Sequence, residues 1–301
     1  MPAAHPKPLP DGTEHRLRLR DGRRLACLEL GAATGQPVIY HHGFPGSRLE
    51  ARLAADSAAR LGLRLLAPDR PGFGESSFQP GRTLGGWADD VAELADQLGL
   101  RRFAVFGVSA GGPYALACAA RLAGRVEAVT LLAPLGPLDW PRLRRGMTTM
   151  SRLGLGLAAR LPPLARGVIR LAAPCARRHP QCLLNRLQAA APASDRAVLA
   201  DPTNRAVLGA TLCEALRQGG RGAAWELTVL ARPWDFALED VHLPVRIWHG
   251  LADTIVPPAL VRHLAARLPC SEVRWLAGEG HHSLILGHFT AALATLSPAG
   301  Q

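Results

Sequence analysis

The stretch from Phe103 to Tyr114 constrains the fold of this chain more than any other. An apolar run of strand type enters it, a helical pattern leaves it, and the sequence G-V-S-A-G from Gly107 to Gly111 lies between them. These five residues alone would also fit a plain turn, but the strand before them and the helix after them favour a nucleophile elbow. Such a turn holds its serine in a strained conformation for which the glycines leave room. Ser109 would then lie at the carboxyl end of a sheet, beside helix N–H groups that favour an oxyanion.

Around this turn, apolar runs of strand type alternate with helical patterns along most of the chain. Asp21-Gly22, between two partly alternating segments, predicts an antiparallel hairpin at a sheet edge. Further strands are predicted at 37–42, 63–68, 103–108, 126–133, 243–250 and 272–276. Helices are predicted over 48–61, from Thr83, over 114–122, from Pro257 and at the C-terminal end. This alternation predicts an α/β fold with a mostly parallel sheet, helices on both faces and functional groups at the carboxyl ends of the strands.

The segment 137–235 breaks the alternation. It has helical stretches, no convincing strand and several prolines, and its fifteen arginines and six acidic residues carry nine of the eleven net positive charges. We interpret 137–235 as an inserted helical cap on a core made of 1–136 and 236–301. Within it, 147–171 mixes leucine, alanine and isoleucine with arginine, a pattern typical of a pocket lid or of a surface that touches anionic lipid. The proline pair 162–163 would break a long surface helix and favours the lid.

Composition limits the partners and the compartment. The net charge of +11 is compatible with nucleic-acid binding, but Lys7 is the only lysine and no aromatic-rich basic stripe is present, so we expect no nucleic-acid partner. The sequence contains no run of about 18 uncharged apolar residues, so it predicts no membrane-spanning helix. The proline-rich lead 1–10 has no apolar signal core, and the six cysteines lack C-x-x-C spacing. We therefore expect a cytoplasmic protein with reduced cysteines, most of them in the core, and without stable membrane insertion. The oligomeric state, a homodimer included, stays open.

Two further residues are placed to activate Ser109. A serine hydroxyl is a poor nucleophile, and it needs a base to take its proton and a carboxylate to orient that base. Asp253 and His281 each lie in a loop directly after a predicted strand, where groups at the carboxyl ends converge.

Five motifs together resemble an α/β-hydrolase-fold protein with a cap, over nearly the whole core. The motifs are His42-Gly43-Phe44-Pro45-Gly46-Ser47, Asp69 to Ser76, Gly107 to Gly112, Gly250 to Pro257 and Gly280-His281. The chain order of Ser109, Asp253 and His281 is the order of that family. The resemblance implies that Ser109 is the nucleophile, Asp253 the acid and His281 the base. It also implies that the backbone N–H groups of Phe44 and Ala110 form the oxyanion hole, and we expect no cofactor.

Both the acid and the base have rivals. Asp253 could instead cap the helix that follows it, and Asp139, after the strand that ends at 133, is the alternative acid. His282 competes with His281, although the position directly after a glycine favours His281.

Other polar residues at strand ends have structural interpretations. His41 and His42 would suggest a metal site, but no Asp, Glu or His set stands at ligand spacing, so we expect them to shape the oxyanion loop and expect no metal ion. Asp69 and Arg70 are expected to hold their loop by hydrogen bonds.

Departures from neighbouring families narrow the function. Dehalogenases and epoxide hydrolases of this fold attack with Asp, whereas this chain has Ser109. Epoxide hydrolases also use tyrosines of the cap, and the two tyrosines of this chain, Tyr40 and Tyr114, are expected in the core. Prolyl aminopeptidases hold a substrate ammonium with cap carboxylates, and this cap is basic. We predict a serine hydrolase that acts on a small to medium carboxylic ester through an acyl-enzyme. A small-molecule receptor or catalytically minor binding protein, a C–C bond hydrolase and a cofactor-free perhydrolase remain alternatives.

The segment 137–235 is expected to fold over Ser109, because water must be kept from the oxyanion site. Leucines such as Leu153, Leu155 and Leu164 would line an apolar acyl pocket there. The arginines would lie mainly on the outer face, where their stems cover apolar surface and their charged ends stay in water.

Overall fold

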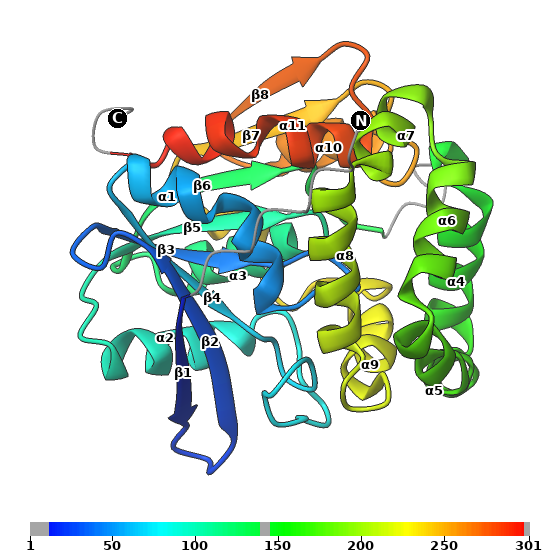
Figure 1. Ribbon diagram of the computed structural model, residues 1–301. Coiled ribbons are helices and arrows are strands. Elements are labelled where there is room, and N and C mark those ends of the chain that lie inside the picture. Colours follow the sequence, from blue (N-terminus) through cyan, green and yellow to red (C-terminus); the bar gives the residue numbers. More distant parts are fainter. Residues whose placement is uncertain (1–11, 139–144, 298–301) are drawn as a thin grey trace, which may run out of the picture.

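The strands lie in one sheet (Figure 1). The computed structural model describes residues 12–138 and 145–297, and within them the sheet has eight strands in the order β1-β2-β4-β3-β5-β6-β7-β8. The strands are β1 (Thr13–Arg18), β2 (Arg24–Gly31), β3 (Gln36–His41), β4 (Leu63–Pro68), β5 (Phe103–Val108), β6 (Val126–Leu132), β7 (Val245–Gly250) and β8 (Ser271–Leu276). β2 pairs antiparallel with β1 and β4, and every other pair is parallel. The predicted edge hairpin and mostly parallel sheet are confirmed.

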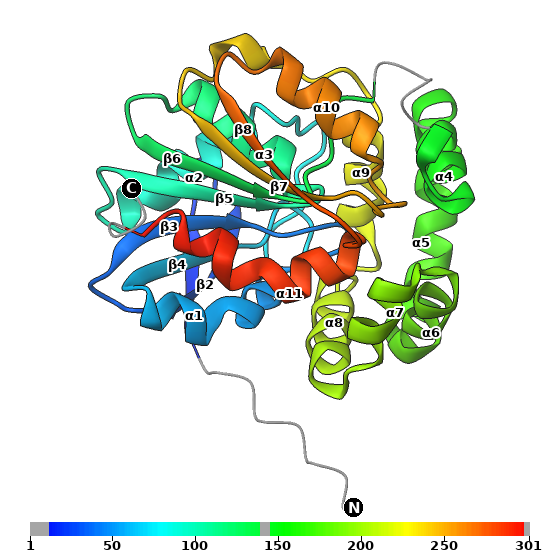
Figure 2. The ribbon, with the colours of Figure 1, turned by 90° about the horizontal axis from the view of Figure 1, so that it is seen from above.

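Helices cover both faces of the sheet (Figure 2). The helices, with η for 3-10 helices, are η1 (Arg48–Ala54), α1 (Ala55–Arg60), α2 (Trp87–Gln97), α3 (Gly111–Arg121), α4 (Thr149–Arg160), α5 (Pro162–Arg178), α6 (Pro180–Ala190), α7 (Ala193–Ala200), α8 (Pro202–Ala215), α9 (Arg221–Leu230), η3 (Leu238–Asp240), α10 (Pro258–Arg267) and α11 (His281–Ala294). In Figure 2, α1 and α11 lie on one face and α2, α3 and α10 on the other. Because helices cover both faces, the side chains on both sides of the parallel strands are buried. These strands therefore have the continuous apolar sequences noted above.

Strand β5 shows how the sheet divides the core. Val105 packs in a cluster with residues of α2, α3 and α10, whereas its neighbour Phe106 packs with residues of α1 and α11. Successive side chains of a strand point to opposite faces, so one strand serves both clusters. Phe106 stacks on Phe289 of α11, with ring centroids 5.2 Å apart. Packing on both sides thus fixes the carboxyl ends of the parallel strands at one edge of the sheet.

Three predicted helices differ from the structure in their first turns. The helix expected over 114–122 begins three residues earlier, at Gly111. The helix expected over 48–61 begins as the 3-10 helix η1 and becomes α-helical only in α1. Arg48 and Glu50 of η1 are buried and bond to neighbouring loops, and these contacts accompany the tighter turn. The helix expected from Thr83 begins at Trp87, since two glycines, poor helix formers, directly precede it.

The expectation that most cysteines lie in the core is wrong. Cys27 and Cys118 are buried, Cys213 is half-buried, and Cys175, Cys182 and Cys270 are exposed; all six are free thiols. Cys175 and Cys182 lie on α5 and α6, and their apolar neighbours in sequence belong partly to exposed helix faces. An apolar run marks burial only where another element covers the helix.

Between β6 and β7, the described residues 145–235 form the helices α4 to α9 and no strand. In both views α4, α5 and α6 lie on the side away from the sheet (Figures 1 and 2). α5 begins at Pro162, so the proline pair separates two helices as predicted. The helical character of this stretch is confirmed, whereas its separation from the core as a cap stays a prediction. Across the described part of the chain, no helix is both long enough and apolar enough to span a membrane.

Candidate active site

Ser109 lies on the sharp turn between β5 and α3. Its φ is +52°, a left-handed conformation that is strained for a residue other than glycine. The turn is held by the Ser109 N–H, which donates to the carbonyl of Leu132 at 2.9 Å. A Cβ atom at Gly111 would lie only 2.0 Å from the carbonyl oxygen of His41, so a side chain there would clash with β3. The strand–turn–helix predicted from the motif is confirmed, with the hydroxyl at the carboxyl edge of the sheet.

The structure brings Ser109, His281 and Asp253 together. The Nε2 atom of His281 lies 3.0 Å from Ser109 Oγ, and its Nδ1 atom lies 2.7 Å from Asp253 Oδ2. His281 is the first residue of α11, and Asp253 follows β7, so three separate strand ends supply the group. His281 and Asp253 are buried, and Ser109 is half-buried. This is the geometry of a nucleophile, a base and an orienting carboxylate.

Asp253 is fixed by its own loop. Its Oδ1 atom accepts hydrogen bonds from the N–H groups of Ile255 and Val256, each at 2.8 Å, which leaves Oδ2 for His281. The N-cap residue of α10 is Pro257, and no side chain caps that helix. The alternative in which Asp253 merely caps α10 is therefore wrong. The rival acid Asp139 lies outside the described residues.

Electrostatics favour the protonated form of His281. Burial alone lowers the pKa of this imidazole, but the charge and hydrogen bond of Asp253 outweigh burial and raise its pKa above the ordinary value. The more distant carboxylates of Asp195 and Glu50 act in the same direction. By contrast, burial lowers the pKa of the neighbouring His282, despite its contact with Asp195. The distances place His281, and not His282, between a carboxylate and the serine.

Asp195 of α7 holds the loop that carries His281, and sequence reasoning missed it. Its Oδ2 atom accepts from the N–H of His281 at 3.1 Å, and its Oδ1 atom accepts from the N–H of Ser283 at 2.8 Å. These N–H groups begin α11, where a negative charge is favourable. Burial raises the pKa of Asp195, but the His282 contact and the Ser283 N–H outweigh burial and lower it. An aspartate in an irregular helical stretch gives no sequence signal for this role.

The loop after β3 lies against the serine turn. A Cβ atom at Gly43 would lie 3.6 Å from the Cβ atom of Ser109. The buried carboxylate of Glu50 accepts from the Gly43 N–H at 3.0 Å and from the hydroxyl of Tyr40. Ser47 and Glu50 have the spacing of a capping box, yet Glu50 bonds to the loop instead, so the local pattern hides this role. Burial raises the pKa of Glu50 above its ordinary value.

The two residues expected to form the oxyanion hole both lie close to Ser109. Ala110 is its neighbour in sequence, and Phe44 lies in the loop after β3 that packs against the serine turn. Ala110 directly follows the serine and is the N-cap residue of α3. Among the described residues, neither the Phe44 N–H nor the Ala110 N–H has a hydrogen-bond acceptor. Both donors are thus available to a ligand oxygen.

The two histidines at the end of β3 are buried and neutral. The Trp87 indole donates to His41 Nδ1 at 3.2 Å, and burial lowers the pKa of His41 to about 3. His42 Nδ1 lies 2.9 Å from the carbonyl oxygen of Gly43, and burial lowers the His42 pKa well below its ordinary value. In the part of the chain that the structure describes, no group of three or more His, Cys, Asp or Glu side chains could hold a metal ion.

Arg70 ties this loop to the helices between β6 and β7. It donates to the carbonyl oxygens of His42 and Gly43 at 2.7 Å and 3.1 Å, and its other N–H groups form a fork with Glu226 of α9 at 2.6 Å and 2.8 Å. Arg82 reaches the same carboxylate at 3.1 Å. All three side chains are buried, and the arginines outweigh burial and lower the pKa of Glu226. The hydrogen bonds expected of the Arg70 side chain are present, but they join the loop after β3 to α9 and do not reach the residues of its own loop 69–76.

Asp69 holds its loop, as expected. Its two carboxylate oxygens accept from the backbone N–H and the guanidinium of Arg48, each at 2.7 Å. Burial raises the pKa of Asp69 to about 6 despite this ion pair.

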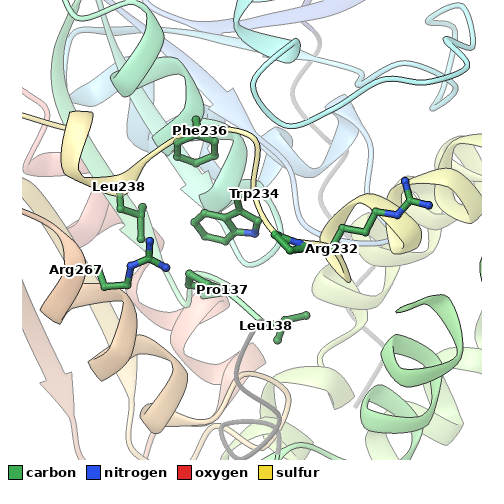
Figure 3. Close-up of a pocket in the computed structure, with 8 residues that line it drawn as sticks. Pro137, Leu138, Arg232, Trp234, Phe236, Leu238 and Arg267 are labelled. Atoms are coloured by element: carbon green, nitrogen blue, oxygen red, sulfur yellow. The ribbon is translucent and has the colours of Figure 1, made fainter. Parts of the chain in front are cut away.

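The described residues include two small cavities, and neither is lined by Ser109, Asp253 or His281. One has a volume of about 140 Å³ and lies beside Arg82 and Trp225. The other, of about 120 Å³, is shown in Figure 3, and its lining residues are Pro137, Leu138, Arg232, Pro233, Trp234, Phe236, Leu238 and Arg267. Both lie where the inserted helices meet the core.

The expectation that three leucines line an acyl pocket is wrong for two of them. Leu153 and Leu164 are 66% and 53% exposed, whereas Leu155 is buried in the main core cluster. An apolar stripe of helical spacing suits an inward or an outward face equally, so the pattern did not settle the direction. The arginines of α4, α5 and α6 are mostly exposed, as predicted.

Comparisons with known proteins agree with this architecture. The family described as alpha/beta hydrolase fold matches residues 36–288. The chain is 30% identical over 223 residues to a pimeloyl-[acyl-carrier protein] methyl ester esterase of Aromatoleum aromaticum, a match that covers 73% of this chain and 81% of that protein. It is 34% identical over 121 residues to a non-heme chloroperoxidase of Streptomyces lividans, covering 39% of this chain and 44% of that protein, so this match spans less than half of the relative's length.

A solved structure shares the fold over nearly the whole chain. An alpha/beta hydrolase fold protein from Nakamurella multipartita has a TM-score of 0.67 at 24% identity, and the alignment covers 96% of this chain and 100% of that one. The family match spans the strand ends that carry Ser109, Asp253 and His281. This chain belongs to the α/β-hydrolase-fold family.

Proposed function

We propose that the chain is a serine hydrolase that cleaves small to medium carboxylic esters through an acyl-enzyme. The observation that carries this proposal is the continuous hydrogen-bond chain from Ser109 Oγ through His281 to Asp253. An isolated serine hydroxyl is a weak nucleophile, and a neutral imidazole within hydrogen-bond reach activates it. Support also comes from the long match to a methyl ester esterase.

The steps follow from this geometry. His281 Nε2 takes the proton of Ser109 as Oγ attacks the ester carbonyl carbon, and the tetrahedral intermediate collapses when His281 returns that proton to the departing alcohol. Water then attacks the acyl-serine with His281 again as base, which releases the acid and restores Ser109. Asp253 holds the Nδ1–H tautomer of His281 and stabilises the imidazolium that forms.

We assign the oxyanion hole to the backbone N–H groups of Phe44 and Ala110. Both donors lack an acceptor within the described residues, and both flank the Ser109 turn. Glu50 supports the assignment, since its bond to the Gly43 N–H holds the loop that carries Phe44. Two preorganised donors and the N-terminus of α3 would stabilise the charge that develops on the carbonyl oxygen.

We also assign a cap role to the inserted helices, with Asp195 of α7 as their contact to the His281 loop. Of the alternatives, peroxide-dependent chemistry is supported by shorter matches, that to the chloroperoxidase among them, and each covers less than half of this chain. A receptor would not need the ordered Ser109–His281–Asp253 chain. Free thiols at all six cysteines fit a reducing compartment, so we propose a cytoplasmic location.

The proposal is tested with p-nitrophenyl esters of graded acyl length and with a fluorophosphonate probe. Wild-type protein should hydrolyse at least the shorter esters and bind the probe covalently, and Ser109→Ala should lose both properties at an unchanged melting temperature. The matched control is Ser271→Ala, at the start of β8 and remote from the site. Probe labelling that persists in Ser109→Ala, or turnover near the wild-type rate, would assign the chemistry elsewhere.

A further inference from the structure

Large apolar side chains are exposed on the helices that lie farthest from the sheet. On α5, Leu164, Val168 and Leu171 recur at helical spacing on one side of the helix and are 53%, 50% and 84% exposed. Met150 and Leu153 on α4 and Leu183 on α6 are exposed as well. Leu161, between α4 and α5, is 54% exposed, and Leu251 is the one exposed large apolar side chain outside this region in the described residues. An apolar concentration of this kind marks an interaction surface.

The same helices are uniformly basic. Residues 149–190 contain no aspartate or glutamate, and they carry seven arginines, Arg152, Arg160, Arg166, Arg170, Arg177, Arg178 and Arg186. None of the seven forms an ion pair with an acidic side chain among the described residues. Six of the seven are exposed, and Arg166 instead lies over the ring of Trp225. We call the exposed apolar and arginine side chains of α4, α5 and α6 the outer helical face.

We propose that the outer helical face docks on an anionic phospholipid bilayer. Leucine, valine and methionine side chains would enter the boundary between headgroups and acyl chains, as they do in interfacial amphipathic helices. Arginines beside them would bind lipid phosphates while their stems add apolar contact. Arg178 continues the α5 stripe seven residues after Leu171, so apolar and cationic groups share one side of that helix. In Figures 1 and 2, α4, α5 and α6 lie at the outside of the molecule, away from the sheet.

Charge and apolarity together select the bilayer over other partners. A second copy of this chain would bring seven arginines against seven more, with no acidic residue on either face. A nucleic acid would satisfy the arginines but would leave the α5 stripe without an apolar partner. A bilayer that contains anionic lipid offers phosphates and hydrocarbon in one surface. The binding is peripheral, since in the described residues no helix could span the membrane.

The test is flotation of the full chain with vesicles of phosphatidylcholine alone or mixed with phosphatidylglycerol. We expect flotation only with the anionic vesicles, and its loss at high salt, because exposed charges are then screened. Two variants separate the apolar contribution to binding from the charge contribution. The triple variant combines Leu164→Gln, Val168→Gln and Leu171→Gln, and the double arginine variant combines Arg170→Gln and Arg178→Gln. Roughly thirtyfold weaker partitioning is expected for the double arginine variant. The control, Arg101→Gln with Arg102→Gln, removes the same charge from an exposed turn before β5 and should float like wild type.

Hydrolysis of a short water-soluble ester should be equal in all three variants, so loss of vesicle binding is distinguished from loss of the active site. The proposal is overturned if wild type does not float with anionic vesicles, or if the control loses as much binding as the double arginine variant. Equal flotation of the triple variant and wild type would also overturn it. Light scattering tests for a dimer. If wild type is a dimer that does not bind vesicles and the triple variant is a monomer, a second copy of the chain covers this face and the proposal is overturned.

Discussion

The backbone N–H of His281 donates to a carboxylate oxygen of Asp195, 86 residues away in sequence, at 3.1 Å. The inserted helices therefore contact the proposed base through the backbone of its loop, whereas Asp253 contacts the imidazole directly. Asp195 fixes the backbone position of His281, whereas Asp253 orients the imidazole ring and raises its pKa. This division of roles leads to different predictions for the two residues.

Asp195→Asn should lower kcat/KM for a short ester by roughly tenfold to hundredfold, because a small displacement of a catalytic group has a large effect on rate. The N–H groups of His281 and Ser283 bond to different carboxylate oxygens, and an amide has only one acceptor oxygen, so one of them would lose its partner and the start of α11 would shift. The control is Asp201→Asn, which changes the N-cap of α8 and does not touch the His281 loop. Kinetics together with fluorophosphonate labelling rates would check this. A normal rate in Asp195→Asn, with the control also normal, would show that the contact is dispensable.

Asp253→Asn should reduce kcat by about 10⁴-fold, since the amide favours the wrong imidazole tautomer and leaves the imidazolium unsupported. The fold should survive, because the amide oxygen still accepts from the N–H groups of Ile255 and Val256. Steady-state kinetics of Asp253→Asn and Asp139→Asn would be compared. If Asp139→Asn is the inactive one, the acid follows β6 and not β7.

The pH dependence of kcat/KM should report the raised pKa of His281. Since the base must be neutral, the rate should rise with pH, with its midpoint above the ordinary histidine value of about 6.5. In Asp253→Asn the residual rate should have its midpoint at lower pH, because the carboxylate that raises the pKa of His281 is gone. Measurements with chemistry rate-limiting over roughly pH 5 to 8 would suffice. A flat profile, or an unmoved midpoint in the variant, contradicts the assignment.

The same shift has a consequence for stability. Folded His281 binds its proton more tightly than the unfolded chain does, so its contribution to the free energy of unfolding is fully present below the ordinary pKa. That contribution is lost as the pH rises through the raised value. In a His281→Gln variant, this part of the pH dependence of unfolding should be absent, as chemical denaturation at several pH values would show.

Glu226→Gln should lower the free energy of unfolding by about 3 kcal/mol or more, since it leaves Arg70 and Arg82 buried without their shared counter-charge. The matched control is Glu127→Gln, which removes an exposed partner 3.4 Å from Arg102 and should cost less than about 1 kcal/mol. Chemical denaturation of both variants is the measurement. Equal stability of the two variants would contradict a structural role for the buried cluster.

The sequence predicted what depends on local backbone. The strands and the Ser109 turn followed from apolar runs and glycine spacing, and the observed sheet and turn agree. Asp253 and His281 were predicted because each follows a predicted strand, and the roles of the three site residues were implied by the family resemblance. The sequence did not predict Asp195 or Glu226, whose partners lie 86 and 156 residues away, because no periodic pattern links such positions. The direction of Leu164 was missed for a related reason: helical spacing defines a stripe but not the element that covers it.

The buried cluster of Arg70, Arg82 and Glu226 bears on how this protein could change over evolution. Helices inserted between two strands are commonly regarded as interchangeable parts, yet here the carboxylate comes from α9 and both guanidiniums come from the core. If the insertion were exchanged for that of a relative without this glutamate, two arginine side chains would be left buried without a counter-charge. Viable chimeras would therefore have their junctions placed so that all three residues are inherited from one parent.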